Sequence, residues 1–360
     1  MSVIVVIGAG VVGLASALAL AARGRAVCVI DRHPRPGQET STHNSGVIHA
    51  GLYHPAASLK TRLCHDGRNR LYAFCRQHDV PYVRCGKLIV AGPGEEAALE
   101  SVERNAAGNG VRLEAMSTAA IRGREPHVNA VAGLWSADSG WIEAEAYVRR
   151  LVSQIEAHDG VVLGGTPLVG IEPGPGGALV VVTPRERIAA EAVVNAAGLF
   201  ADQVSSMAGG DPFVVYPCRG EYAELAPRAR DKVRGLVYPV PHDSGHGLGV
   251  HLTRTLGGAV WIGPTIHYQS DKTDYESGRL PLEDFLEPTR KLLPGITMDD
   301  LRLGSSGIRA KLHPPTERFA DFLIRRDSRV PALIHAAGID SPGLTASLAI
   351  GEFVADIVTN

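Results

Sequence analysis

The first thirty-one residues contain the feature that most restricts how this chain can fold. The β-branched run Val3–Ile7 predicts a buried strand of a parallel sheet, and glycines follow it at positions 8, 10 and 13. An Ala- and Leu-rich stretch over 14–23 predicts a helix, and a second apolar strand over 26–30 is followed by Asp31. Strand, glycine turn, helix, strand and acidic residue in this order predict a βαβ unit that binds a dinucleotide.

Each glycine of the turn has a physical role in such a site. Gly8 permits the tight turn, Gly10 lets the backbone approach a pyrophosphate, and Gly13 allows the helix to pack closely on the strand. The phosphates bind to free N–H groups at the start of the helix, where the helix dipole favours an anion. Asp31 can bind the ribose hydroxyls, which favours an unphosphorylated adenosine ribose over NADP. NAD and FAD both fit this pattern, and a glycine turn without a ligand is the alternative.

The length and composition indicate a globular protein of two domains. The chain has 360 residues, of which 45% are apolar and 21% are charged. A formal net charge of -2 without a Lys/Arg run predicts no binding to nucleic acid. The five cysteines include no C-x-x-C pair, so we expect no disulfide framework, no metal site and a cytoplasmic location. The uncharged run over 3–22 belongs to the predicted strand and helix, so we expect no integral membrane segment.

The segment that follows Asp31 narrows the choice of nucleotide. Residues 40–53 (TSTHNSGVIHAGLY) closely resemble the flavin-contacting loop of L-2-hydroxyglutarate dehydrogenases and oxidases. Six further motifs continue the resemblance over nearly the whole chain: residues 58–64, 85–91, 219–222, 238–241, 249–253 and 341–347. The wider group is the superfamily of D-amino-acid oxidase and glycerol-3-phosphate dehydrogenase.

This resemblance implies an α/β protein with a Rossmann-like FAD-binding domain and a second, mixed or antiparallel α+β substrate domain. The FAD-binding domain would be discontinuous and comprise residues 1–78, 141–209 and 302–360. The substrate domain would comprise residues 79–140 and 210–301, with strands expected at 88–91, 237–238, 248–253 and 259–263.

The resemblance also implies the residues that contact FAD. The expected cofactor-binding residues are Gly8, Gly10, Val12, Gly13, Asp31, Arg32, Thr42, Asn44, Ser45, Gly46, Val169, Ala197, Gly198, Gly343, Leu344 and Thr345. Ser341 is expected to cap a C-terminal helix whose N-terminus points at the pyrimidine end of the flavin. Some superfamily members attach FAD covalently through a histidine near the position of His43. Here the sequence Asn-Ser-Gly follows His43, as in the hydroxyglutarate group, so we expect non-covalent FAD.

Candidates for binding the substrate carboxylate are cationic or hydroxyl side chains in the family motifs. Arg309 is the first choice, because a guanidinium can grip a carboxylate with two parallel hydrogen bonds. An arginine in a surface ion pair is the alternative. Lys311, Arg219 and Tyr53 are further candidates for substrate binding.

Two histidines are candidates for the catalytic base. His49 lies in the flavin loop, and His251 lies mid-strand in the expected substrate sheet. An imidazole titrates near 6.5, so either residue can accept a proton at neutral pH. A mid-strand histidine is more often a core residue, but the resemblance favours a role in the site for both.

The leading interpretation is an enzyme that oxidises an L-2-hydroxy acid, first L-2-hydroxyglutarate to 2-oxoglutarate, by hydride transfer to flavin N5. The electron acceptor would be oxygen or a quinone, and a peripheral contact with the inner face of the membrane is compatible with a cytoplasmic enzyme. An amine or amino-acid oxidase on the same fold, a non-catalytic flavin-binding protein and an NAD-only enzyme are the alternatives. The sequence does not indicate an oligomeric state.

Overall fold

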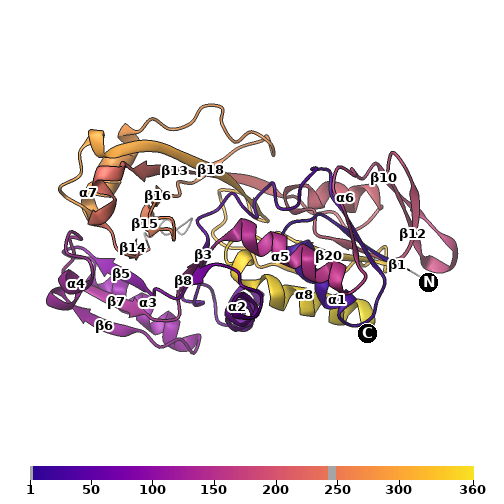
Figure 1. The fold of residues 1–360 in the computed structure, drawn as a ribbon, viewed down its shortest axis with the longest axis horizontal. Helices are drawn as coiled ribbons and strands as arrows, with labels where there is room; N and C mark the ends of the chain where they lie inside the picture. The colour runs from indigo at the N-terminus through magenta and orange to yellow at the C-terminus, as the bar shows by residue number, and fades with distance from the viewer. Residues whose placement is uncertain (1–2, 242–248) are drawn as a thin grey trace.

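The chain forms two large β-sheets that lie next to each other along the long axis of the molecule (Figure 1). The computed structural model describes residues 3–241 and 249–360. Both ends of the described chain lie in the same lobe, on the right of Figure 1.

The first sheet contains the predicted βαβ unit. Strand β1 pairs in parallel with β2 on one side and with β12 on the other, and β12 also pairs in parallel with β20. This parallel centre confirms the predicted Rossmann-like fold. The strands of this sheet are β1 (Val3–Ile7), β2 (Val27–Ile30), β9 (Val161–Leu163), β10 (Gly170–Pro173), β11 (Leu179–Val182), β12 (Arg187–Asn195), β19 (Leu323–Arg326) and β20 (Leu333–Ala337).

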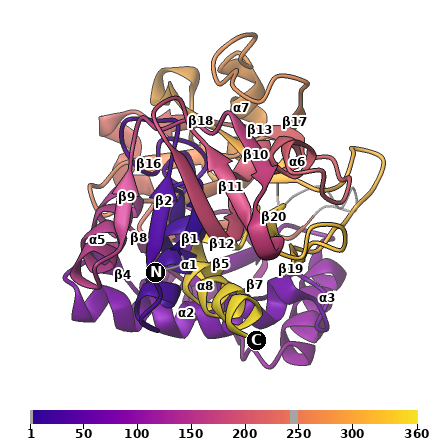
Figure 2. The same cartoon turned by 90° about the vertical axis from the view of Figure 1, so that its right-hand side faces the viewer.

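Apolar side chains on both faces of β1 explain why its sequence is a continuous apolar run. Ile4 and Val6 belong to a core that includes the packed helices, whereas Val5 and Ile7 belong to a second core on the opposite face. The helices of this lobe, several of which are visible in Figure 2, are α1 (Val11–Ala21), α2 (Leu59–Gln77), α5 (Ala144–Ala157), α6 (Ala201–Met207) and α8 (Gly343–Thr359). Along the described residues, no helix combines the length and the apolar character that crossing a membrane requires.

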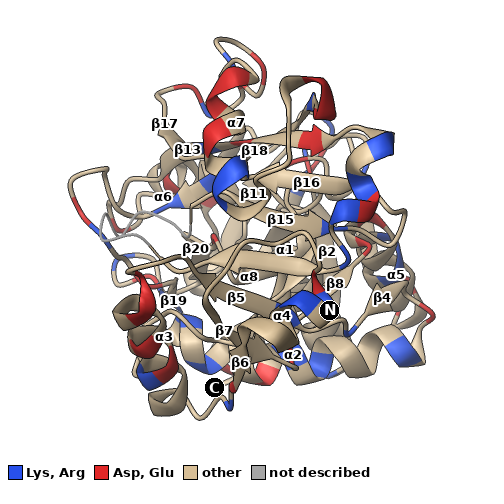
Figure 3. Cartoon of the chain, turned by 90° about the vertical axis from the view of Figure 1, so that its left-hand side faces the viewer, with Lys and Arg blue, Asp and Glu red and all other residues tan. Residues whose placement is uncertain are grey.

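The second sheet is mixed, as predicted. Most neighbours in it are antiparallel, but β14 pairs in parallel with β5. Helices α3 (Glu96–Gly108), α4 (Thr118–Arg124) and α7 (Glu283–Leu292) belong to this lobe, where acidic and basic side chains are interspersed (Figure 3). The strands are β5 (Lys87–Ala91), β6 (Glu114–Ser117), β7 (Ala132–Ser136), β13 (Tyr216–Leu225), β14 (Leu236–Pro239), β15 (His251–Arg254), β16 (Val260–Gly263), β17 (His267–Tyr268) and β18 (Leu301–Lys311).

The strands expected at 88–91, 237–238 and 259–263 are confirmed by β5, β14 and β16. The strand expected at 248–253 is observed from His251, and Leu248 lies outside the described residues.

The position of strand β18 differs from the predicted boundary, which assigned residues 302–360 to the FAD-binding domain. It pairs with β13 along nearly its whole length, so residues 301–311 extend the second sheet rather than the FAD-binding lobe. The other domain boundaries stay a prediction. A small third sheet, made of β3 (Val47–Ile48), β4 (Tyr82–Val83) and β8 (Gly140–Ile142), carries part of the flavin-loop motif.

Candidate active site

A cavity of about 940 Å³ extends from the glycine turn of the first sheet to the wall of the second. Gly8, Asp31 and Ala197 line one end, at the carboxyl ends of β1, β2 and β12. This is where open α/β sheets bind their ligands. His251 and Arg309 line the other end, and they come from β15 and β18 of the second sheet.

The glycine turn has the shape that a bound phosphate requires. A Cβ atom on Gly8 would lie 2.5 Å from the Ala196 carbonyl oxygen, and one on Gly13 would lie 1.9 Å from the Gly8 carbonyl oxygen. Among the described residues, a Cβ atom on Gly10 would closely approach only the Ser41 Oγ atom, at 2.9 Å. Gly8 and Gly13 are therefore required by the fold, whereas Gly10 lines the cavity and keeps that space open.

Asp31 and Ser41 fix the backbone around this turn. The Ala9 N–H donates to Asp31 Oδ2 at 2.6 Å, and the His33 N–H donates to Asp31 Oδ1 at 2.8 Å. The Val11 N–H, in the first turn of α1, donates to Ser41 Oγ at 2.9 Å. The acidic residue thus braces the turn in addition to facing the cavity.

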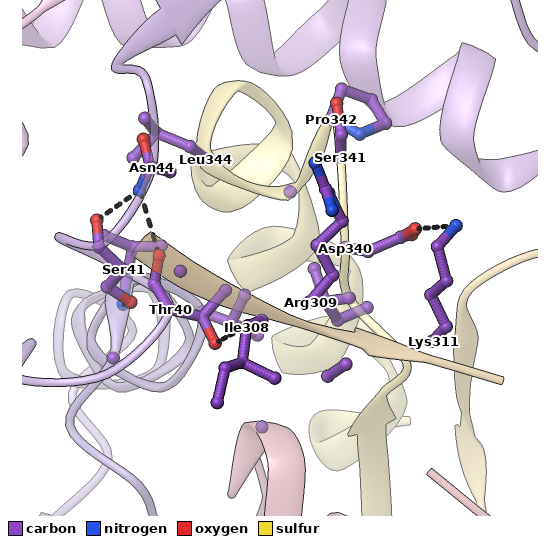
Figure 4. Close-up of a pocket in the computed structure, with 18 of the residues that line it drawn as sticks. Thr40, Ser41, Asn44, Ile308, Arg309, Lys311, Asp340, Ser341, Pro342 and Leu344 are labelled. Carbon is purple, nitrogen blue, oxygen red and sulfur yellow. Dashed lines mark hydrogen bonds and ion pairs between the residues drawn. The ribbon is translucent and has the colours of Figure 1, made fainter. Parts of the chain in front are cut away.

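The flavin-loop motif is held by its own side chains. Asn44 Nδ2 donates to the carbonyl oxygens of Thr40 (3.0 Å) and Ser41 (2.8 Å), as Figure 4 shows. Thr40 Oγ1 donates to the Ile308 carbonyl oxygen of β18 at 2.8 Å. The Asn44 bonds hold the loop in shape, and the Thr40 bond connects it to the second sheet.

The expected cofactor residues divide into two groups. Those that line the cavity are Gly8, Gly10, Val12, Asp31, Arg32, Asn44, Ser45, Ala197, Gly198, Gly343 and Leu344. The other five are not among the residues that line the cavity: Gly13, Thr42, Gly46, Val169 and Thr345. Thr42 Oγ1 donates to the Gly37 carbonyl oxygen at 2.7 Å, and a Cβ on Gly46 would lie 2.7 Å from the Ile142 carbonyl oxygen. Val169 is 53% exposed, and its neighbours 166–168 line the cavity instead.

The start of α8 differs from the predicted cap. The helix begins at Gly343 with Pro342 in the N-cap position and no side-chain cap, so the prediction of Ser341 as N-cap was wrong. The Ser341 hydroxyl instead lies 3.3 Å from His49 Nε2, in the cavity. Thr345 Oγ1 accepts a hydrogen bond from the His49 N–H at 3.0 Å, so the helix start and the flavin loop hold each other.

His251 is buried and neutral. Its Nδ1 atom lies 3.0 Å from the Gly249 carbonyl oxygen, which can only accept, so the ring carries its proton on Nδ1. Nε2 then keeps a lone pair. The ring stacks on Tyr238 with 3.8 Å between centroids. Burial lowers the pKa of His251 to about 3, and the charges of Lys87 and Arg309 contribute to this shift.

His49 is neutral for a similar reason. Burial holds the pKa of its imidazole well below 6.5, and the charge of Lys87 adds to this effect. Both histidines that the sequence suggested therefore line one cavity in a form that can accept a proton.

Arg309 enters the cavity without an acidic partner among the described residues. Its Nη1 donates to the Thr265 carbonyl oxygen at 3.2 Å. A Cβ atom on Gly220 would lie 2.7 Å from the guanidinium, so the glycine of that motif makes room for Arg309. Lys311 also lines the cavity, but its Nζ lies 3.3 Å from Asp340 Oδ2 (Figure 4).

Arg219 does not line the cavity. Its guanidinium is 3% exposed and lies 3.0 Å from Glu221 Oε1, and it also donates to the Ser277 carbonyl oxygen at 2.8 Å. Cys218 is the register partner of Arg309, so Arg219, the next residue, points to the other face of the sheet. The expectation that Arg219 binds substrate is therefore contradicted.

Two aromatic side chains and one lysine of the cavity wall were not predicted as site residues from the sequence. Tyr222, Tyr238 and Lys87 all line the cavity next to the expected Tyr53. Lys87 begins the strand Lys87–Ala91, in which every residue is buried. A charged residue in a strand that is apolar on both faces is the signal that could have identified it.

Comparisons with known proteins agree with this geometry. A family model described as FAD dependent oxidoreductase matches residues 4–357. The mitochondrial L-2-hydroxyglutarate dehydrogenase of Arabidopsis thaliana is 35% identical over 98% of this chain and 82% of its own length, and the human protein of the same name is 31% identical over 99% and 88%. Among solved structures, L-alpha-glycerophosphate oxidase from Mycoplasma pneumoniae with FAD bound has a TM-score of 0.91 at 25% identity, covering 100% of this chain and 96% of that one. Glycine oxidase from Geobacillus kaustophilus shares the fold, with a TM-score of 0.84 at 21% identity over 100% and 95% of the two chains.

Proposed function

Since this chain belongs to the family of FAD-dependent oxidoreductases, we propose that it oxidises an L-2-hydroxy acid, with L-2-hydroxyglutarate as substrate and 2-oxoglutarate as product. The observation that carries the proposal is the shared cavity. The guanidinium of Arg309, which has no acidic partner among the described residues, and the neutral imidazole of His251 line the same end of it. Relatives that carry the name L-2-hydroxyglutarate dehydrogenase align over nearly the whole chain.

The residues present fit FAD. The open space at Gly10 and the N-terminus of α1 suit its pyrophosphate, Asp31 suits its ribose, and residues 44–45 and 343–344 suit its flavin. When bound, FAD supplies the two-electron acceptor that the oxidation needs. We propose that FAD binds non-covalently. His43 is the histidine to which a covalent flavin would attach, and its Nδ1 atom lies 3.0 Å from the Glu39 carbonyl oxygen, within hydrogen-bond distance.

The chain's own residues bind and orient the substrate and accept its proton. Arg309 holds the α-carboxylate through two parallel hydrogen bonds, which determines which enantiomer presents its α-hydrogen to the cofactor end of the cavity. His251 Nε2 accepts the hydroxyl proton, and His49, hydrogen-bonded to Ser341, is the second candidate for that role. Tyr53 and Lys311 line the same space.

We propose that the electrons pass to oxygen or a quinone and that the enzyme is cytoplasmic. All five cysteines are unpaired, which supports a reducing compartment.

Anaerobic mixing with a panel of 2-hydroxy and 2-amino acids tests the function directly. We expect L-2-hydroxyglutarate to bleach the flavin absorbance faster than L-lactate, D-2-hydroxyglutarate or any amino acid. Faster bleaching by the D-enantiomer or by an amino acid would overturn the substrate assignment while leaving the flavoprotein assignment intact. A protein that is colourless and cannot be reconstituted with FAD would overturn both.

Replacement of Arg309 by methionine is expected to lower kcat/KM for the hydroxy acid. Each charged hydrogen bond contributes about 1.5–3 kcal/mol, which corresponds to a loss on the order of tenfold to several-hundredfold. Lysine at this position should restore only part of the rate, because it keeps the charge but loses the forked geometry. Steady-state kinetics of the three proteins, with FAD content as the control, measures the effect; an unchanged kcat/KM in Arg309→Met would place the carboxylate elsewhere.

A further inference from the structure

Lys87 is a buried cation with no hydrogen-bond partner among the described residues. The residue is 0% exposed, and its Nζ atom makes no hydrogen bond within the described part of the chain. Nζ lies between two aromatic faces, 4.8 Å from the ring centroid of Tyr53 and 4.5 Å from that of Tyr238. Cation–π contacts with two rings replace part of the lost hydration, but they leave the three N–H donors unused.

The partnerless ammonium lies in the wall of the active-site cavity. Lys87, Tyr53 and Tyr238 all line that cavity. The Tyr53 hydroxyl is also buried without a hydrogen-bond partner among the described residues. Buried polar groups normally have partners, so two neighbouring donors without one indicate a ligand that supplies acceptors. A carboxylate has the charge and the two oxygens that such a pair of donors can bind.

The other lysines of the cavity already have a carboxylate partner. Among the described residues, Lys60 and Lys311 share Asp340, with Nζ–Oδ distances of 2.6 Å and 3.3 Å. Burial alone would raise the pKa of Asp340, but the two lysines lower it to about 2, so this carboxylate stays charged. Lys87, in contrast, has no carboxylate partner among the described residues, so no charge of the protein there competes with an added anion.

Lys87 and Arg309 lie on different strands, β5 and β18, and both act electrostatically on His251. The candidate base is thus within range of two separate cations. We propose that Lys87, together with the Tyr53 hydroxyl, binds the second carboxylate of a dicarboxylic 2-hydroxy acid whose first carboxylate is on Arg309. This rests on the proposed function and names Lys87 as the residue that selects a dicarboxylate over a monocarboxylate.

Contact with the ligand requires a small movement. The two tyrosine rings cover Nζ, so the four-carbon stem of Lys87 must rotate, or a ring must turn, when the carboxylate arrives. Burial lowers the pKa of Lys87 to about 7, so in the free enzyme the amine is partly neutral near neutral pH. The incoming carboxylate stabilises the protonated form, and binding should take up a proton.

The test compares two non-reacting ligands of equal chain length, glutarate and pentanoate, on the FAD-loaded enzyme. Each is titrated while the flavin absorbance is recorded. In the wild type we expect glutarate to bind about 10- to 100-fold more tightly than pentanoate, the range typical of one charge-assisted pair. Lys87→Met should remove this preference and leave the affinity for pentanoate within about twofold.

A stability measurement separates ligand binding from a structural role. Methionine has a similar length and removes an uncompensated buried charge, so Lys87→Met should keep or raise the Tm of the ligand-free enzyme. Lys87→Gln is the second variant; it keeps a polar end without the charge and should also lose the preference for glutarate.

The pH dependence is a further readout. The groups that face Lys87 are His49, His251, Tyr53, Tyr238 and Cys64. Burial lowers the pKa of both histidines and raises the pKa of both tyrosines and, to about 12, that of Cys64. Lys87 is therefore the member of this group that titrates near pH 7, and wild-type affinity for glutarate should fall by up to about tenfold per pH unit above it. In Lys87→Met this fall should disappear.

Lys311→Met is the matched control, because Lys311 is the competing candidate for the second carboxylate. Loss of the preference in Lys311→Met but not in Lys87→Met would overturn the proposal for Lys87. If L-2-hydroxyglutarate reduces the flavin and Lys87→Met keeps the full preference for glutarate, the Lys87 inference fails and the proposed function stands. If no hydroxy acid reduces the wild-type flavin, the proposed function fails, and this inference fails with it.

Discussion

Gly10→Val is expected to give a folded protein that contains no FAD. The Gly10 backbone is extended, with φ -78° and ψ 173°, so a side chain is sterically allowed there by the backbone. Among the described residues, its first carbon would meet only the Ser41 hydroxyl, which can rotate away at the cost of the hydrogen bond that it accepts from the Val11 N–H. The remaining methyl groups would fill the space in which a pyrophosphate approaches the backbone. The loss of binding should therefore be nearly complete, whereas the Tm should approach that of the FAD-free wild type.

Two variants serve as controls for Gly10→Val. Asp31→Ala removes the hydrogen bond that Asp31 accepts from the turn and those that we propose it makes to the ribose, a loss of roughly 1–3 kcal/mol, and should weaken FAD binding less. Gly13→Val should prevent the turn from forming, because its Cβ would lie 1.9 Å from the Gly8 carbonyl oxygen. FAD content is measured by the visible absorbance of the purified protein and by release into the supernatant after acid precipitation. Full occupancy in Gly10→Val would show that the phosphates bind elsewhere, and yellow colour left in the wild-type pellet would point to a covalent bond at His43.

His251→Ala is expected to slow flavin reduction without emptying the cofactor site. Loss of a general base typically lowers the rate by about a hundredfold to ten-thousandfold. His251 belongs to the second sheet, away from the glycine turn, so FAD content should remain at the wild-type level. Stopped-flow reduction under saturating hydroxy acid measures the rate constant of this step.

The pH profile provides a second check on His251. Its pKa of about 3 keeps the ring neutral, so the wild-type reduction rate should stay level from about pH 5 to about pH 7. An ordinary imidazole, with a pKa near 6.5, would become protonated as the pH falls, and the rate would drop about tenfold per unit below pH 6. Equal reduction rates in the wild type and in His251→Ala would transfer the role to His49. Equal rates in both single variants would exclude a histidine base.

Local patterns in the sequence were sufficient for the nucleotide end of the site. Asp31 and the three glycines lie in the same βαβ unit, so their spacing predicts the hydrogen bond from Ala9 to Asp31 and the contact of Gly8 with Gly13. The contact of Gly8 with Ala196 is an exception, because Ala196 follows the distant strand β12. The helix cap was harder to predict. Ser341 has the chemistry of an N-cap, but its hydroxyl lies beside His49, a residue nearly three hundred positions earlier in the chain.

The substrate end depends on pairing between distant strands, which a single sequence does not reveal. Whether an arginine points into the cavity depends on the register of β13 against β18, and that register puts Arg309 on the cavity face and Arg219 on the other. Lys87 was missed for the same reason. Its significance lies in the two tyrosine rings that the fold brings around it, one from the flavin loop and one from β14.

The close packing of α1 against α8 has a consequence for biosynthesis. A Cβ atom on Gly351 of α8 would lie 2.4 Å from the Ala15 carbonyl oxygen of α1, so the two helices touch along their backbones. Strand β20, which comes shortly before α8, completes the parallel part of the first sheet next to β12. During translation the glycine turn is synthesised long before the helix and strand that enclose it, because β20 and α8 come much later in the chain. The nascent chain therefore leaves the face of α1 that packs on α8 uncovered until α8 has been synthesised, and we expect the complete nucleotide end of the site to form only after that point.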